Sequence, residues 1–102
     1  MFKAAILLKR RNGTSFDEFR TWWLDEHRPL ARTLPGLRRA VFNLVTGDGE
    51  AEFDGISELW FDSEQAFLDA YATETGKAVA ADSMARVERR VRLMVVEHEV
   101  FP

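Results

Sequence analysis

Hydrophobic positions along the chain follow two different periods. Apolar runs of strand length are bounded by turn residues or charged clusters, as is typical of β-strands. These runs are Phe2–Lys9, Leu37–Val45, Ile56–Phe61 and Val91–Phe101. Between the first and second runs, and between the third and fourth, apolar residues recur every three or four positions, which indicates helices. The pattern predicts the order β-α-β-β-α-β.

The first helix has a clear beginning and end. Ser15 and Glu18 form a Ser-x-x-Glu capping box, in which side chains satisfy backbone N–H groups at a helix start. Apolar side chains then fall at positions 16, 19, 23, 30 and 34, and Pro35-Gly36 ends the pattern. Because Pro29 cannot donate a hydrogen bond to the carbonyl of Asp25, we expect a kink at the proline.

The second half repeats this arrangement. Asp62-Ser63 caps a helix, Thr73–Gly76 interrupts it, and a further helical segment covers Lys77–Arg89. The connection Thr46–Asp54 is polar and acidic. The element order predicts an α+β, ferredoxin-like fold with a four-stranded antiparallel sheet, formed by residues 1–102 as one domain.

Both faces of the predicted sheet are apolar. In the first strand, Ala4, Ile6 and Leu8 point one way, while Ala5 and Leu7 point the other way. Both crossover helices of this fold cover the same face, so the opposite face needs another cover. We expect a second copy of the chain on it, giving a two-fold homodimer. A monomer with one open apolar face is the alternative.

Composition narrows the function classes. The 102 residues contain no cysteine, which excludes disulfides and thiolate metal sites. Seventeen acidic against fourteen basic side chains give a net charge of −3, which argues against nucleic-acid binding. No apolar run is long enough for a membrane span or a signal peptide, so a cytoplasmic location is expected. The histidines lack metal-ligand spacing, and we expect neither a metal nor another cofactor.

His27 is the candidate for chemistry. It fills the gap in the apolar stripe of the first helix and therefore points with Trp23 and Leu30 toward the sheet. Apolar surroundings disfavour the charged imidazolium, and a neutral imidazole suits general acid–base catalysis. The alternative is a core histidine that bonds a backbone group.

Topology brings further polar residues to the same sheet edge. The ends of the first helix and of the third and fourth strands gather there, and the two strand ends carry Glu58, Trp60 and His98. Spacing leaves open whether these side chains face the helices or a second copy. An ion pair between Glu58 and Arg38 or Arg39 on the neighbouring strand is the structural alternative.

Two other charged features complete the chain. Asp82 has helical spacing from apolar neighbours, so it either faces inward or caps a helical turn in solvent. Basic and acidic clusters are expected at the sheet edge opposite His27, where they neutralise one another. The clusters are Lys9-Arg10-Arg11, Arg89-Arg90-Arg92 and the acidic Asp48, Glu50, Glu52 and Asp54.

The chain resembles the EthD-domain family of the dimeric α+β barrel superfamily. The resemblance rests on the order of several short segments along the chain. They are Leu8-Lys9-Arg10, Ser15–Phe19, Trp23 with His27-Arg28-Pro29-Leu30, Leu34–Leu37, Phe53-Asp54-Gly55, Glu58–Phe61, Asp82 and Glu97-His98. It implies two ferredoxin-like monomers packed sheet to sheet, with a pocket between the sheet and the helices of each. His27 matches the histidine of the family's His-x-Pro-Leu motif.

The resemblance leaves two functions open. Similar proteins are linked to degradation of ethers and aromatic compounds and are broadly classed as oxidoreductases. The first hypothesis is a cofactor-independent isomerase, dehydratase or oxidoreductase, with His27 as general acid or base and Glu58 or Asp82 orienting it. The second is a non-catalytic protein that binds a hydrophobic metabolite or supports a partner oxidase. The expected substrate-binding residues are Trp23, Trp60, Phe19 and His98.

Overall fold

The computed structural model describes residues 1–47 and 50–101, so Asp48 of the acidic cluster lies outside the described residues. Its elements are β1 (Phe2–Arg10), α1 (Phe16–Thr21), the π-helix η1 (Trp22–His27), α2 (Arg28–Ala31), β2 (Arg39–Leu44), β3 (Gly55–Phe61), α3 (Glu64–Ala72), α4 (Glu74–Arg86) and β4 (Val87–Val95). The strands form one antiparallel sheet in the order β2-β3-β1-β4. This confirms the α+β ferredoxin-like fold.

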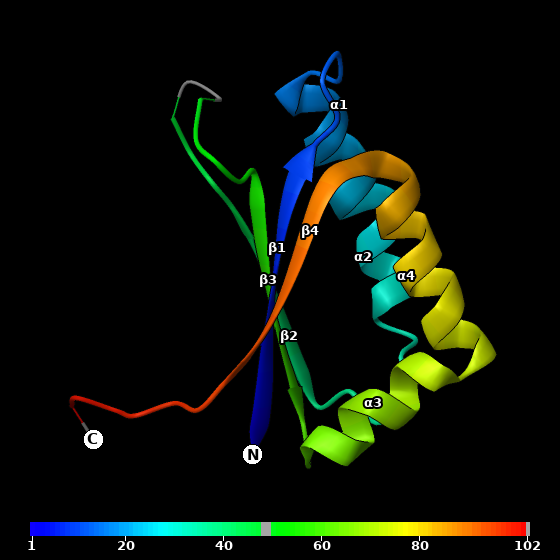
Figure 1. Cartoon of the computed structure of the whole chain (residues 1–102), viewed down its shortest axis with the longest axis vertical. Coiled ribbons are helices and arrows are strands. Elements are labelled where there is room, and N and C mark those ends of the chain that lie inside the picture. Colours follow the sequence, from blue (N-terminus) through cyan, green and yellow to red (C-terminus); the bar gives the residue numbers. More distant parts are fainter. Residues whose placement is uncertain (48–49, 102) are drawn as a thin grey trace.

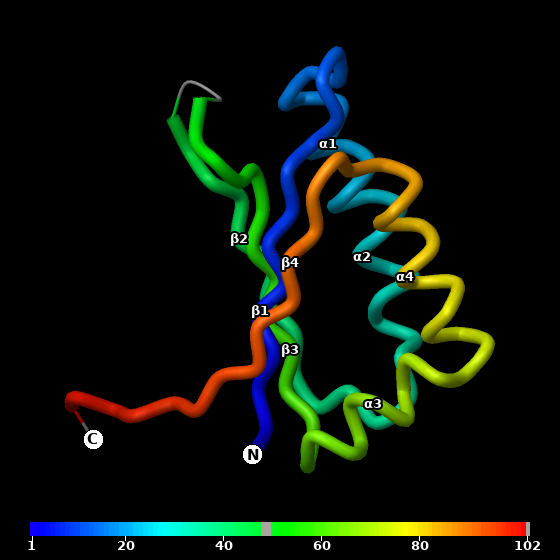
Figure 2. The backbone as a smooth tube through the Cα atoms, viewed as in Figure 1, coloured from blue at the N-terminus to red at the C-terminus, as the bar shows by residue number. Residues whose placement is uncertain are grey.

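All helices lie on one side of the sheet (Figure 1). Ala4, Ile6 and Leu8 of β1 are buried on this inner face, and their neighbours Ala5 and Leu7 are half-buried on the outer face. The chain after β4 leads away on the side opposite the helices, as the backbone trace shows (Figure 2). No helix in the described part of the chain is long and apolar enough to cross a membrane.

The first helical region contains a π-turn that the sequence pattern does not predict. The capping box forms as expected, with Ser15 Oγ accepting from the Glu18 N–H at 3.0 Å. The Arg28 N–H then reaches back five residues, to the carbonyl of Trp23. The wider turn buries Trp22 as well as Trp23. The departure from α-geometry therefore begins before Pro29, and α2 ends at Ala31.

The last strand and the helix before it differ from the prediction. Thr73 caps α4 by accepting from the Gly76 N–H at 3.0 Å, so the helix begins at Glu74. The strand was expected over Val91–Phe101, but β4 covers Val87–Val95. Val95 pairs with Lys3, at the start of β1, and the chain beyond it has no strand partner in the described residues.

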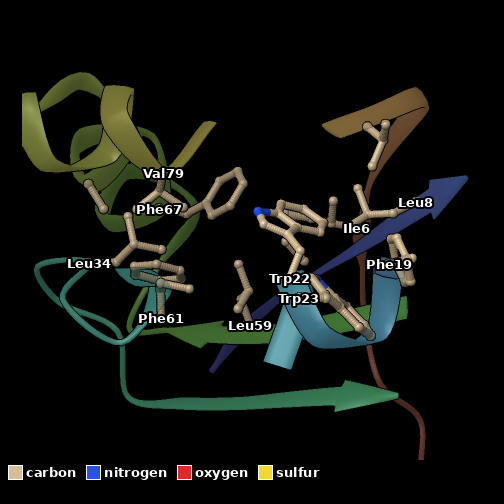
Figure 3. Packing of buried hydrophobic residues seen from close by; sticks show 14 residues of the cluster. Ile6, Leu8, Phe19, Trp22, Trp23, Leu34, Leu59, Phe61, Phe67 and Val79 are labelled. Atoms are coloured by element: carbon tan, nitrogen blue, oxygen red, sulfur yellow. The ribbon is translucent and has the colours of Figure 1, made fainter. Parts of the chain in front are cut away.

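The core is built around aromatic rings from α1 and η1, which point toward the strands (Figure 3). Trp23 is fully buried and stacks on Phe42 of β2, with ring centroids 4.5 Å apart. The indole also lies over Gly55, where an added Cβ would come within 2.7 Å of two ring carbons. Gly55 therefore leaves the space that the Trp23 ring fills.

The expected charge neutralisation occurs at the far sheet edge. Asp54 is buried and pairs with Arg10 Nη1 at 2.5 Å and Lys9 Nζ at 3.5 Å. Arg89 pairs with Glu52 at 2.8 Å. Arg90 was grouped with this cluster, but it shares the inner face with its register partner Leu8. Its side chain therefore belongs to the space between sheet and helices.

The Trp23–Gly55 contact predicts a coupled stability effect. Gly55→Ala adds a methyl group against the indole and is expected to lower the free energy of unfolding by about 1–3 kcal/mol, measured by urea denaturation. Trp23→Phe removes the ring carbons that the new methyl group would meet. In the Trp23→Phe background, Gly55→Ala should therefore cost markedly less. If Gly55→Ala lowers the free energy of unfolding equally in both backgrounds, the predicted clash with the indole of Trp23 is wrong.

Candidate functional site

His27 lies between two hydrogen-bonding groups of α4. Its Nδ1 is 2.8 Å from Oδ2 of Asp82, and its Nε2 is 3.2 Å from Oγ of Ser83. A carboxylate only accepts hydrogen bonds, so Nδ1 carries the proton and Nε2 offers its lone pair to the Ser83 hydroxyl. This assignment makes Nε2 the basic atom of the site.

The π-turn and α4 together fix this geometry. The π-turn directs Trp22 and His27 to the same side, with ring centroids 5.1 Å apart. Trp22 Nε1 donates to Oδ2 of Asp82 at 3.2 Å, which is the oxygen that His27 contacts. Asp82 therefore faces inward and does not serve as a solvent-exposed cap. The indole holds the carboxylate in place, and the carboxylate orients the imidazole.

Burial sets the charge state of the histidine. The His27 side chain is 6% exposed, and desolvation lowers the pKa of His27 below its ordinary value. The hydrogen bond and the charge of Asp82 oppose this shift, while the Arg90 guanidinium adds to it. The net lowering keeps the imidazole neutral near pH 7, as general acid–base chemistry requires.

A small cavity of about 10 Å³ lies beside His27, between the helices and the sheet. Its polar lining residues are His27, Ser57, Tyr71, Ser83 and Arg90. Its apolar lining residues are Ile6, Leu8, Ala31, Phe42 and Leu59. This volume holds about one water molecule. The pocket implied by the family resemblance is therefore in the expected place but nearly closed.

Arg90 and Tyr71 are site residues that the sequence reasoning missed. They share a side-chain hydrogen bond, and burial raises the pKa of Tyr71 and lowers that of Arg90. The Nε of Arg90 is buried and has no hydrogen-bond partner in the described part of the chain. Arg90 stands directly opposite Leu8 in the sheet. The prediction missed this pairing because it starts the last strand at Val91, four residues after its observed start at Val87.

Glu58 and Trp60 do not join His27. Both lie on the outer face of β3, where Lys3 pairs with Glu58 at 2.6 Å. Asn43 also bonds Glu58, at 3.1 Å, and these two neighbours lower the pKa of Glu58. The partner expected from sequence was Arg38 or Arg39. Trp60 Nε1 donates to Glu97 at 2.8 Å.

Three other predicted residues lie outside the cavity. His98 follows β4 and is exposed, so it cannot contact a ligand beside His27 in this chain. Trp23 and Phe19 are buried in the core, and neither lines the cavity. Of the three predicted catalytic residues, His27 and Asp82 come together, and Glu58 lies apart from them. Within the described residues, no three histidine or carboxylate side chains gather as a metal site.

Comparison with protein families gives one match, the EthD domain, over residues 11–87. No curated protein matches the chain significantly. The match covers both helical regions and the strands β2 and β3, and it ends at Val87, the first residue of β4.

Solved structures share the fold over nearly the whole chain. An ethyl tert-butyl ether D family protein from Bacillus halodurans is 26% identical, with a TM-score of 0.82 over 96% of this chain and 100% of that chain. A dimeric ferredoxin-like protein from Thermobifida fusca is 16% identical, with a TM-score of 0.75 over 94% and 90%. A hydroxynitrile lyase from Passiflora edulis is 17% identical, with a TM-score of 0.76 over 99% and 96%.

The lowered pKa of His27 predicts acid sensitivity. The unfolded histidine titrates near 6.5, above the folded one. As the pH falls through this range, the unfolded state binds more protons and folding loses stability. The free energy of unfolding should therefore fall by up to about 1.4 kcal/mol per pH unit between about pH 6.5 and the lower folded pKa.

Urea denaturation across this pH range of wild type and His27→Gln checks the expectation. The variant lacks the titrating group and should show a flatter profile. His98→Gln removes the other histidine from an exposed position and, as the matched control, should keep the wild-type profile. A wild-type slope in His27→Gln would contradict the buried neutral histidine.

Proposed function

The chain belongs to the EthD domain family, and from this premise we propose that it binds a small, apolar, oxygenated or aromatic metabolite between sheet and helices. His27 acts there as general base and then as general acid, without a cofactor. The reaction class is an isomerisation, dehydration or related cleavage that begins with proton removal.

The observation that carries the proposal is the hydrogen-bonded row of half-buried Asp82 with buried His27 and Ser83. Asp82 holds the Nδ1–H of the imidazole at 2.8 Å, and this leaves the Nε2 lone pair at the cavity. A substrate that displaces the Ser83 hydroxyl from Nε2 presents its own proton to a desolvated, neutral base. Proton transfer of this kind contributes about 10²–10⁴-fold to a rate.

Arg90 supplies the complementary positive charge, and Tyr71 shares a hydrogen bond with it. Proton removal next to a carbonyl moves the C–H electron pair into the new enolate, and negative charge gathers on the oxygen. The unpartnered Nε of Arg90 is a donor of the correct charge for that oxygen. The proton on Nε2 then returns to another atom of the same substrate, so the reaction needs no external oxidant or reductant.

The cavity lining favours an apolar substrate body. Five of its lining residues are hydrophobic, and among them Phe42 stands with its ring centroid 6.1 Å from that of His27. The Passiflora edulis hydroxynitrile lyase shows that this fold can carry a lyase. That likeness concerns the fold alone. The role of His27 therefore rests on the geometry of this chain.

The non-catalytic alternative uses the same residues. A binding or accessory protein that supports a partner oxidase would need the apolar lining, but not a base held in one tautomer. The Asp82–His27 contact and the Trp22 bond to the same carboxylate favour the catalytic function. Substrate binding without any proton exchange would instead indicate the accessory function.

We further propose a homodimer formed through the outer sheet face. Leu93 on this face is 46% exposed, and half-buried Ala5, Leu7 and Val91 surround it in the strand register. Burial of such a surface by an identical surface is the usual origin of a two-fold dimer. The dimeric ferredoxin-like protein from Thermobifida fusca supports this arrangement.

Proton exchange is the direct test of the base. In D₂O the wild-type protein should accelerate deuterium incorporation at the α-carbon of 2-tetralone, an apolar ketone with acidic C–H bonds, as measured by NMR. His27→Gln should abolish the acceleration. Asp82→Asn should lower it by about tenfold or more, because the imidazole loses its anionic partner.

Ser83→Ala is the control that separates a base from a nucleophile. The Ser83 hydroxyl only occupies Nε2 in the proposed mechanism, so the variant should retain exchange within a few-fold of wild type. Complete loss in a folded Ser83→Ala would contradict Nε2 as the atom that removes the proton. Wild-type exchange in folded His27→Gln would overturn the catalytic proposal altogether.

The dimer has its own test. Leu93→Asp places a charge on the outer face and should shift the molar mass measured by light scattering from two chains toward one. Leu68→Asp is the matched control, because Leu68 is 41% exposed on α3, on the helical side. A wild-type protein that is monomeric at high concentration would contradict the dimer.

A further inference from the structure

A second, larger concavity lies at the β2 edge of the sheet. It has a volume of about 680 Å³ and runs between α2 and β2. Four of the fourteen basic side chains of the protein line it, namely Arg28, Arg32, Arg38 and Arg39. No acidic residue is among its lining residues in the described part of the chain. The groove is therefore strongly cationic in a protein whose net charge is −3.

Two of these arginines are committed to neighbours. Arg38 forms a two-fold hydrogen bond with Asp62, at 2.9 and 3.1 Å. The Arg39 guanidinium lies 4.5 Å from the ring centroid of Trp60, on the outer face. The remaining cations of the groove are Arg28, the first residue of α2, and Arg32, which caps the C-terminal end of that helix.

Arg28 and Arg32 are one helical turn apart, so both lie on the same side of α2. Neither forms an ion pair with a described residue, and Arg28 uses only its Nε, which donates to the carbonyl of Leu24 at 3.0 Å. Cations are favoured at a helix C-terminus, which explains one arginine there. Here two arginines border a groove that no acidic residue lines in the described part of the chain. Such a pair of guanidinium groups suits an anion.

The groove is continuous with the His27 cavity. Phe42 and Ala31 line both spaces. The Phe42 ring stacks on Trp23 and stands beside His27, with centroid separations of 4.5 and 6.1 Å. The groove floor is otherwise apolar, with Leu37, Ala40 and Pro29. Phe42 is thus the partition between the cationic groove and the buried base.

We propose that the groove binds a small aromatic or alicyclic carboxylic acid. Arg28 and Arg32 hold the carboxylate, and the apolar body lies on Phe42 and Ala40. Where the proposed function holds, the inference names its substrate class: an organic acid whose far end reaches His27 when the Phe42 ring turns aside. Binding in the groove itself does not depend on His27.

Direct binding of 2-naphthoate, with neutral 2-naphthamide as the uncharged comparison, tests the groove. Calorimetry or fluorescence should show that the wild-type protein binds 2-naphthoate more tightly than 2-naphthamide. The Arg28→Gln/Arg32→Gln double variant should bind the acid at least about tenfold more weakly, with little change for the amide. Arg20→Gln removes an equivalent exposed charge on α1 and should bind like wild type.

Backbone NMR locates the probe. The acid should shift the amide signals of Ala40 and Phe42. Equal affinity for acid and amide, a double variant that binds like wild type, or shifts confined to other parts of the chain would each overturn the proposal. Should the double variant fold poorly, Arg32→Gln alone carries the test, with an expected loss of several-fold.

His27→Gln separates this inference from the proposed function. It should bind 2-naphthoate within about two-fold of wild type, because it removes neither arginine. If the wild-type protein binds 2-naphthoate through its arginines but does not accelerate proton exchange, the groove proposal stands and the catalytic proposal fails. If the protein accelerates proton exchange but its affinity for 2-naphthoate does not depend on Arg28 and Arg32, the catalytic proposal stands and the groove proposal fails.

Discussion

The π-turn of η1 is the constraint on which the rest of the structure depends. A regular helix would direct only one of two adjacent tryptophans inward, whereas the five-residue reach from Arg28 to Trp23 turns both inward. Trp23 then fills the space over Gly55, and Trp22 reaches the carboxylate that orients His27. Packing and chemistry therefore share one backbone irregularity, as is common for π-turns at functional sites.

Burial removes the polar groups of Trp23 and His27 from water. The Trp23 Nε1–H is buried with no partner in the described residues, which costs about 1–3 kcal/mol. His27 loses solvation as well, but it gains Asp82 and Ser83. The stacked ring of Phe42 closes over both side chains, so the hydrophobic contacts that offset the unpaired indole also exclude water from the imidazole. A dry, oriented base follows from the same packing.

Sequence patterns predicted the element order, the capping box and the inward His27, because these depend on local periodicity and side-chain chemistry. They misplaced the last strand, since its end depends on where β1 begins to offer partners. Because of this error, the prediction left Arg90 out of the strand that lines the cavity and put His98 into it. Glu58 and Trp60 could not be assigned a face by alternation alone, because both sheet faces are apolar. The inward position of Asp82 could not be predicted, because it depends on a hydrogen bond from Trp22, and the burial of Trp22 depends on the π-turn.

The sheet divides the molecule into two chemically distinct halves. On the helical side, His27 of η1 and Arg90 of β4 line a cavity together with apolar side chains. The outer face carries the Lys3–Glu58 pair, together with the Trp60–Glu97 hydrogen bond, among apolar neighbours. Trp60 is 8% exposed although no helix covers it, because Lys3 and Arg39 lie over its ring. A second copy on this face would enclose charges that are already paired, which removes much of the desolvation penalty of burying them. The polar cluster on the outer face is therefore compatible with the proposed dimer.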